Sequence, residues 1–133
     1  MHEWALAEAV IVKAEEVAVA NGLASVSRVE VRIGELQAID REAFEFGLGL
    51  LRAEHPVMAG AAFSIEPDLA ELRCRRCSHG WYLVESLSAL SEEEREAIHL
   101  LPEVVHLYVT CPTCGTPDFE VLTGRGVSLA AVS

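Results

Sequence analysis

The four cysteines of this chain all lie in two Cys-x-x-Cys pairs, Cys74 with Cys77 and Cys111 with Cys114. Two residues between thiolates let both sulfurs of a tight turn bind one ion, and two such turns supply the four ligands of a tetrahedral zinc site. A site with four protein ligands leaves no open coordination position, which catalytic zinc requires. The sequence therefore predicts structural Zn(II), and any metal with another role must bind elsewhere.

Two disulfides, or a thioredoxin-like redox pair, are the alternative for these cysteines, because their number is even. Charged and aromatic residues (Glu3, Trp4, Glu8) interrupt the start of the chain, which argues against a signal peptide. Paired Cys-x-x-Cys turns in a cytosolic chain usually bind metal rather than form disulfides. We therefore favour zinc and expect a cytoplasmic location.

The segment between the two cysteine pairs is long. It covers the 33 residues from Ser78 to Thr110, whereas zinc ribbons commonly have about 15 to 20 residues there. Ser91-Glu92-Glu93-Glu94 is a capping box that opens a helix running to about Leu100, before Pro102. The zinc lobe is thus expected to carry a helical insert.

The net charge of -11 argues against nucleic acid as a partner, because phosphate binding needs clustered lysine and arginine. The basic run Arg73, Arg75 and Arg76 is a local exception, which we explain by cations that offset the negative charge of a zinc tetrathiolate. No apolar run approaches the length of about 18 residues that spans a membrane. We expect neither nucleic acid nor membrane as a partner.

The first 60 residues follow a helix, strand, helix pattern. Residues 3–20 are rich in helix formers with apolar residues at helical spacing, and residues 28–33 alternate between apolar and charged side chains, as a strand with one wet face does. Asp40 is the expected N-cap of a second helix, which must end before Pro56. Further strands are predicted at 61–66, 69–73, 81–84, 107–109, 119–122 and 127–132.

These elements predict an α+β fold: two helices on a small mixed or antiparallel sheet, with an inserted four-cysteine lobe that resembles a zinc ribbon. The last strand, 127–132, is expected to return antiparallel to strand 28–33. The predicted domains are a discontinuous α/β domain, 1–70 plus 118–133, and a zinc-binding domain with the helical insert, 71–117.

The chain begins Met1-His2-Glu3. A histidine at position 2 can chelate a metal through the free amine, its own deprotonated amide and the imidazole. Three nitrogens then lie in one plane, which suits square-planar Ni(II) or Cu(II). The alternative is a frayed terminus with an idle histidine.

Three features together resemble the HypA family of nickel metallochaperones over the whole chain. They are Met1-His2-Glu3 ahead of a helix, the strand end Ile33-Gly34-Glu35-Leu36, and the late Cys-Pro-x-Cys-Gly turn. The resemblance implies a protein that is not an enzyme but carries Ni(II), as transient cargo, to the large subunit of NiFe hydrogenase together with a HypB-type GTPase. Some relatives also serve urease, and the long insert resembles the archaeal branch.

The resemblance also implies the roles of individual residues. His2 would be the essential nickel ligand, Met1 would contribute its amine, and Glu3 would border the site, while the four cysteines hold zinc. A fourth planar donor is still needed. His99 is our first candidate and His106 our second, and Glu3 is the competing donor. Surface histidines without a metal are the alternative for both, and His79 and His55 are expected to be turn or loop residues.

Three candidate functions differ in what they require of the sequence. Nickel delivery is the first, and a zinc-ribbon adaptor that only binds proteins is the second, in which case His2 would be dispensable. A metal-dependent hydrolase is disfavoured, because the sequence has no H-E-x-x-H motif, nucleophile elbow or phosphate loop. The sequence allows a monomer or a domain-swapped dimer, and does not separate hydrogenase from urease as the client.

Overall fold

The structure is a computed structural model that describes residues 2–37 and 39–133. The chain folds into two compact units, which we describe separately. The first comprises Met1–Arg32, Ile39–Glu66 and Val127–Ser133, and the second Ile33–Ala38 and Pro67–Gly126. None of the described helices has the length and apolar character needed to cross a bilayer.

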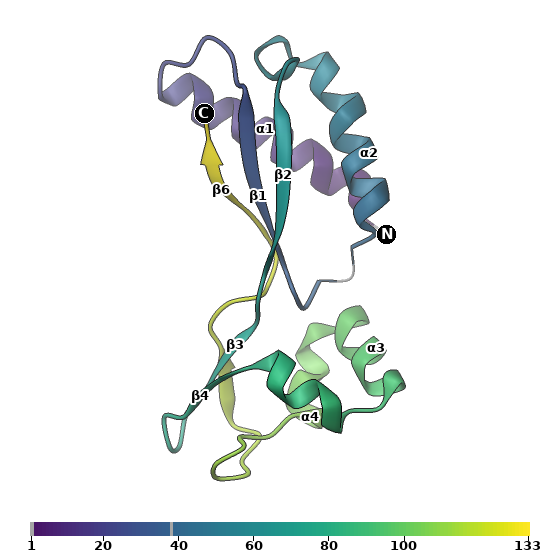
Figure 1. Ribbon diagram of the computed structural model, residues 1–133, viewed down its shortest axis with the longest axis vertical. Helices are drawn as coiled ribbons and strands as arrows, with labels where there is room; N and C mark the ends of the chain where they lie inside the picture. The colour runs from purple at the N-terminus through teal and green to yellow at the C-terminus, as the bar shows by residue number, and fades with distance from the viewer. Residues whose placement is uncertain (1, 38) are drawn as a thin grey trace. The chain divides into compact units, whose positions relative to one another are not determined.

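Two helices form one layer of the first unit: α1 (Glu3–Ala20) and α2 (Arg41–Leu51). Both helices are seen in Figure 1. They pack closely at Gly47, where a Cβ atom would lie 3.1 Å from the Cβ of Ala7. Two short 3-10 helices, η1 (Arg52–Glu54) and η2 (Pro56–Met58), follow α2. Asp40 caps α2 as predicted, since its carboxylate accepts the Ala43 N–H at 3.2 Å.

A three-stranded sheet has the order β2-β1-β6, with β1 (Arg28–Gly34) in the centre. The outer strands are β2 (Ala62–Asp68) and β6 (Val127–Val132). Backbone hydrogen bonds join the start of β1 to the end of β6 and the end of β1 to the start of β6, so this pair is antiparallel, as predicted. The β1–β2 bonds run in the same sense along both strands, which makes that pair parallel and the sheet mixed.

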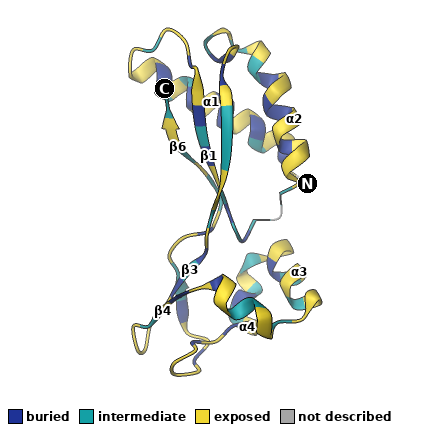
Figure 2. Ribbon diagram, in the orientation of Figure 1, coloured by how far each residue is buried: buried dark blue, intermediate teal, exposed yellow. Residues whose placement is uncertain are grey.

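A second sheet lies in the second unit, with the order β4-β3-β5. Its strands are antiparallel: β3 (Glu71–Cys74) pairs with β4 (Gly80–Tyr82) on one side and with β5 (Phe119–Val121) on the other. The rest is helical, as η3 (Leu83–Ala89), α3 (Glu92–Leu100), η4 (Pro102–Val104) and α4 (Val105–Tyr108). Figure 2 shows the buried residues of each unit gathered along its strands and inner helix faces.

The prediction of a strand at 107–109 is wrong. Pro102 begins a helical turn that continues as α4 to Tyr108, and only then does the chain extend. Val105 and Val109 are both buried, and their spacing of four residues is that of a helix face. The predicted strand at 81–84 is shorter than expected, because η3 begins at Leu83.

Glycines permit a close backbone crossing in the second unit. A Cβ atom on Gly124, whose φ is +95°, would lie 2.5 Å from the Cα of the fully buried Ala70. A Cβ atom on Gly34 would collide with the Gly124 backbone. The Gly34 N–H donates to the Gly126 carbonyl at 2.7 Å and the Ala70 N–H to the Glu35 carboxylate at 2.7 Å. The crossing therefore has no room for larger side chains.

Candidate metal sites

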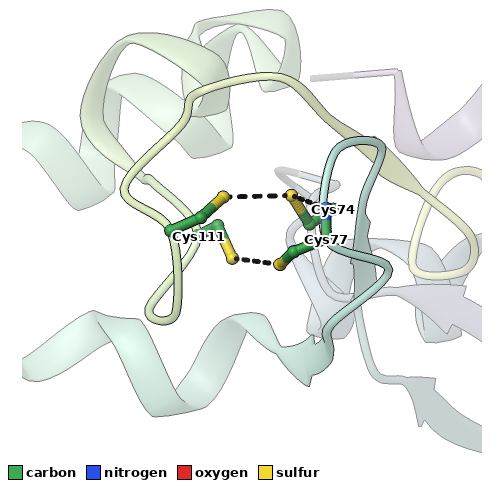
Figure 3. A group of neighbouring side chains, drawn as sticks. Cys74, Cys77 and Cys111 are labelled. Atoms are coloured by element: carbon green, nitrogen blue, oxygen red, sulfur yellow. Dashed lines mark hydrogen bonds between the residues drawn. The ribbon is translucent and has the colours of Figure 1, made fainter.

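The four predicted cysteines come together at one point of the second unit, from the turn that follows β3 and the turn that precedes β5 (Figure 3). Their sulfurs all lie within 4.8 Å of one another, with 3.5 Å between Cys74 and Cys114 and 3.6 Å between Cys77 and Cys111. Four sulfurs about 2.3 Å from one zinc ion are about 3.8 Å apart at tetrahedral angles. The separations are too long for disulfides, which need about 2.05 Å, and they suit a metal such as zinc.

Backbone N–H groups point at two of the sulfurs. The Cys74 Sγ accepts from Arg76 at 3.3 Å and from Cys77 at 3.4 Å, and the Cys111 Sγ accepts from Thr113 at 3.4 Å. Burial by itself raises the pKa of Cys74, but these N–H groups stabilise the thiolate and lower that pKa to about 6. Such bonds also offset the charge of a metal tetrathiolate and orient its ligands.

The two cysteine turns have the same backbone conformation. In the first, Ser78 N–H donates to the Cys74 carbonyl at 3.1 Å, and in the second, Gly115 N–H donates to the Cys111 carbonyl at 2.9 Å. Both donor residues are left-handed, with φ of 64° at Ser78 and 78° at Gly115. Glycine adopts this conformation without strain, and serine does not.

Two of the predicted nickel residues, His2 and Glu3, differ in how far they are exposed. His2 is exposed and immediately precedes α1, whereas Glu3 is only 8% exposed. The Glu3 Oε1 accepts the backbone N–H of Asp40 at 3.0 Å. The hydrogen bonds that the Glu3 carboxylate accepts lower its pKa to about 2. Met1 lies outside the described residues.

Glu3 thus has a structural partner that the sequence analysis missed. In α3, the Glu94 side chain bonds back to the N–H of its own N-cap, Ser91. The corresponding residue of α2 is Ala43, which cannot do this, and Glu3 supplies the missing carboxylate from α1. The missing Glu or Gln at position 43 leaves the Asp40 N–H without a local acceptor, but no local pattern names Glu3 as the residue that supplies one.

The remaining histidines occupy distinct surroundings. In the second unit, His79 stacks on Trp81 with ring centroids 5.8 Å apart, and His106 lies 4.4 Å from the Phe119 ring. His99 is exposed and lines a cavity of about 160 Å³ together with Glu35, Arg95 and three apolar residues (Leu83, Leu87, Ile98). In the first unit, the His55 Nδ1 lies 3.1 Å from the Glu15 carboxylate.

A small α/β unit and a four-cysteine lobe on one chain define a metal-binding protein. Comparison with known proteins narrows the class. The family described as hydrogenase/urease nickel incorporation metallochaperone, hypA, matches residues 1–133. The hydrogenase maturation factor HypA of Pyrococcus abyssi is 43% identical over 133 residues, which cover 99% of this chain and 94% of the relative. This chain belongs to the HypA family.

More distant comparisons agree with this assignment. The HypA of Francisella philomiragia is 28% identical over 132 residues, covering 99% of this chain and 97% of the relative. The solution structure of the nickel metallochaperone HypA from Helicobacter pylori has a TM-score of 0.67 and 25% identity, covering all of this chain and 97% of that one. The predicted fold class is confirmed, as is the prediction of a maturation factor rather than an enzyme.

Proposed function

We propose that this protein binds Ni(II) at its N-terminus and delivers it to the large subunit of NiFe hydrogenase during maturation. The observation that carries the proposal is the exposed His2, directly ahead of α1, in a member of a nickel-incorporation family. His2 supplies its imidazole and its deprotonated amide, and Met1 supplies the amine. These nitrogens form the planar donor set that Ni(II) prefers.

Zinc has a different part in this proposal. The four cysteines hold a resident Zn(II) ion that stabilises the fold of their lobe, because a small metal lobe gains much of its folding free energy from the metal. The proposed division has nickel in residues 1–70 and 118–133 and zinc in residues 71–117, and it differs from the two compact units at residues 33–38, 67–70 and 118–126. Limited proteolysis with and without a zinc chelator tests that division, since only the zinc part should become sensitive.

Release of nickel follows from the small number of ligands. Ordering a chain terminus costs conformational entropy, which opposes binding and keeps the affinity moderate. The amine and the imidazole must both lose protons to bind, so mild acid weakens binding.

His99 and Glu3 are the two candidates for the fourth planar donor. An imidazole is a good donor for Ni(II), whereas the Glu3 carboxylate already accepts the Asp40 N–H. We therefore keep His99 as the candidate. His99→Ala is compared with Glu3→Ala by X-ray absorption of the nickel complex: loss of one imidazole from the spectrum in His99→Ala supports the candidate, and an unchanged spectrum removes it.

Acidic residues of α1 are proposed to dock the GTPase partner in the cytoplasm. Glu8 is exposed, while Glu16 lies 3.6 Å from Lys13 and Glu15 lies 3.1 Å from His55, so Glu8 is the side chain to change first. Complex formation with a HypB-type GTPase should weaken with salt and with Glu8→Lys. Binding that is insensitive to both rejects this surface.

Acetylation of the N-terminus is the direct test of the donor set. It removes the amine from the chelate and should abolish nickel binding while leaving zinc content and fold unchanged. A zinc-ribbon adaptor without metal delivery would show no nickel binding in either form. Equal nickel affinity in the acetylated and free forms would reject the amine as a ligand.

A further inference from the structure

A small cavity of the second unit brings His99 together with an acid. The cavity has a volume of about 160 Å³, and its charged or polar lining residues are Glu35, Arg95 and His99. Arg95 and His99 are four residues apart in α3, so both lie on the helix face that lines the cavity. His99 is also exposed, so it borders both the cavity and the solvent.

The main chain around Glu35 holds its carboxylate in place. The Oε2 atom accepts the Ala70 N–H at 2.7 Å, and the backbone N–H of Glu35 donates to the Asp68 carbonyl at 2.8 Å. The next residue, Leu36, is fully buried, and its N–H donates to the Gly124 carbonyl at 3.0 Å. The Oε1 atom accepts no hydrogen bond from the residues that the structure describes. Glu35 thus offers a fixed acceptor with one oxygen available.

Arg95 does not compete for this oxygen. Its Nε and Nη2 donate to the Leu87 carbonyl at 3.0 and 2.6 Å. No ion pair joins Arg95 to Glu35 within the described part of the chain. The remaining lining residues are apolar, namely Leu83, Leu87 and Ile98. Because a guanidinium cannot accept a hydrogen bond, the Glu35 carboxylate is the lining side chain to which a His99 N–H can donate.

We infer that Glu35 positions the imidazole of His99. The ring nitrogen that faces the cavity donates its N–H to Glu35, directly or through one water, for which a cavity of this size has room. That bond fixes the tautomer and leaves the second ring nitrogen unprotonated, where it can bind a metal. A carboxylate that accepts from a metal-binding histidine orients the ring and strengthens it as a donor. For nickel, this consequence rests on the proposed function, in which His99 is the fourth donor.

Glu96 is the rival acceptor, since it precedes His99 by three residues in α3. It is exposed and lines a different surface groove, together with Glu92, Glu93, Ala97 and Leu100. Glu96→Gln removes the same charge as Glu35→Gln on the helix that carries His99, but leaves the lining of the cavity unchanged. The two variants therefore separate a bond across the cavity from a general effect of acidic charge.

The first experiment uses the zinc-loaded, nitrogen-15-labelled full chain without nickel, in mildly alkaline buffer where imidazoles are neutral. Long-range proton–nitrogen spectra report the two tautomers of each histidine ring. One tautomer of His99 should dominate in the original chain, which needs no substitution. In Glu35→Gln, the amide oxygen still accepts the Ala70 N–H, and the amide N–H₂ offers the ring a donor instead of an acceptor. The tautomer ratio of His99 should therefore change by at least about threefold, as the loss of one hydrogen bond implies.

The controls for this measurement lie in the same spectra. Glu96→Gln should leave the tautomer ratio of His99 nearly unchanged, and the rings of His79 and His106 should not respond to either variant. An equal mixture of His99 tautomers in the original chain would overturn the inference. An unchanged ratio in a folded Glu35→Gln, or an equal change in Glu96→Gln, would overturn it as well.

Nickel titration tests the consequence separately. Glu35→Gln should weaken nickel binding by about tenfold, the lower end of the usual loss for a residue that orients a metal ligand. It should have no further effect in a His99→Ala background, and a loss that persists there would reject a role through His99. Nickel binding unaffected by His99→Ala would reject the proposed fourth donor, while the tautomer measurement still decides the contact between Glu35 and His99.

Discussion

The carboxylate of Glu3 accepts the backbone N–H of Asp40 at 3.0 Å, across 37 residues of sequence. Asp40 in turn accepts the Ala43 N–H with its own side chain, so the first turn of α2 depends on both acids. The residue next to His2 thereby ties the start of α1 to the start of α2. A nickel site built on His2 begins on a fixed helix end, although its first residue is a chain terminus.

Removing the Glu3 carboxylate should destabilise the first unit. Glu3→Ala leaves the Asp40 N–H without this acceptor, so the urea midpoint of unfolding should fall. The midpoint of Glu3→Gln should fall less, because the amide oxygen of glutamine can still accept this hydrogen bond. Asp40→Ala should cost about 1 kcal/mol, the usual value for a lost N-cap. Glu8→Ala, at an exposed position of the same helix, is the control. A midpoint for Glu3→Ala equal to that of the control would contradict the capping role.

Zinc removal should expose one tryptophan and leave the other unchanged. Trp81 is 3% exposed and lies in the second unit, whereas Trp4 is 51% exposed and lies in the first. Chelation, or Cys111→Ser, should shift the emission of Trp81 to longer wavelength, because the metal supplies much of the lobe's folding free energy. The shift should vanish in Trp81→Phe and persist in Trp4→Phe. Retention of a blue emission after complete zinc removal would show that the lobe folds without metal.

The left-handed residues of the two cysteine turns should respond oppositely to substitution. Gly115→Ala introduces strain of about 1 kcal/mol at a φ of 78°, while Ser78→Gly relieves strain at a φ of 64°. In competition with a zinc chelator, Gly115→Ala should lose zinc roughly fivefold more readily, and Ser78→Gly should hold it at least as well as the original chain. Reversal of this order would mean that backbone conformation does not govern the site.

The glycine crossing should tolerate no side chain. Gly34→Ala forces a Cβ atom against the Gly124 backbone and should cost about 1 to 3 kcal/mol, as overpacking does. Gly49→Ala makes the same change inside α2, where nothing lies within 4 Å of the new atom, and should gain up to about 1 kcal/mol through helix propensity. Thermal unfolding distinguishes the two variants. Similar melting temperatures for Gly34→Ala and Gly49→Ala would contradict the close approach of the backbone segments at Gly34.

Local sequence patterns predicted most of the elements and the four-cysteine cluster. The extents of α1 and α3, the cap of α2 and the return of β6 all follow from spacing and capping signals that act over a few residues. The helix α4 was missed because Leu107 to Val109 alone is too short to show a helical period, and the relevant pair is Val105 with Val109. The Glu3–Asp40 bond joins residues far apart in sequence, so no local pattern contains it.

Nickel binding by His2 can be tested by a single titration. The untagged chain and His2→Ala are titrated with Ni(II) while zinc content is measured in parallel. We expect one nickel per chain for the original protein, loss of that binding in His2→Ala, and one zinc per chain in both. Nickel bound equally well by His2→Ala, with zinc intact, would contradict the N-terminal site and leave the protein as a zinc-containing adaptor.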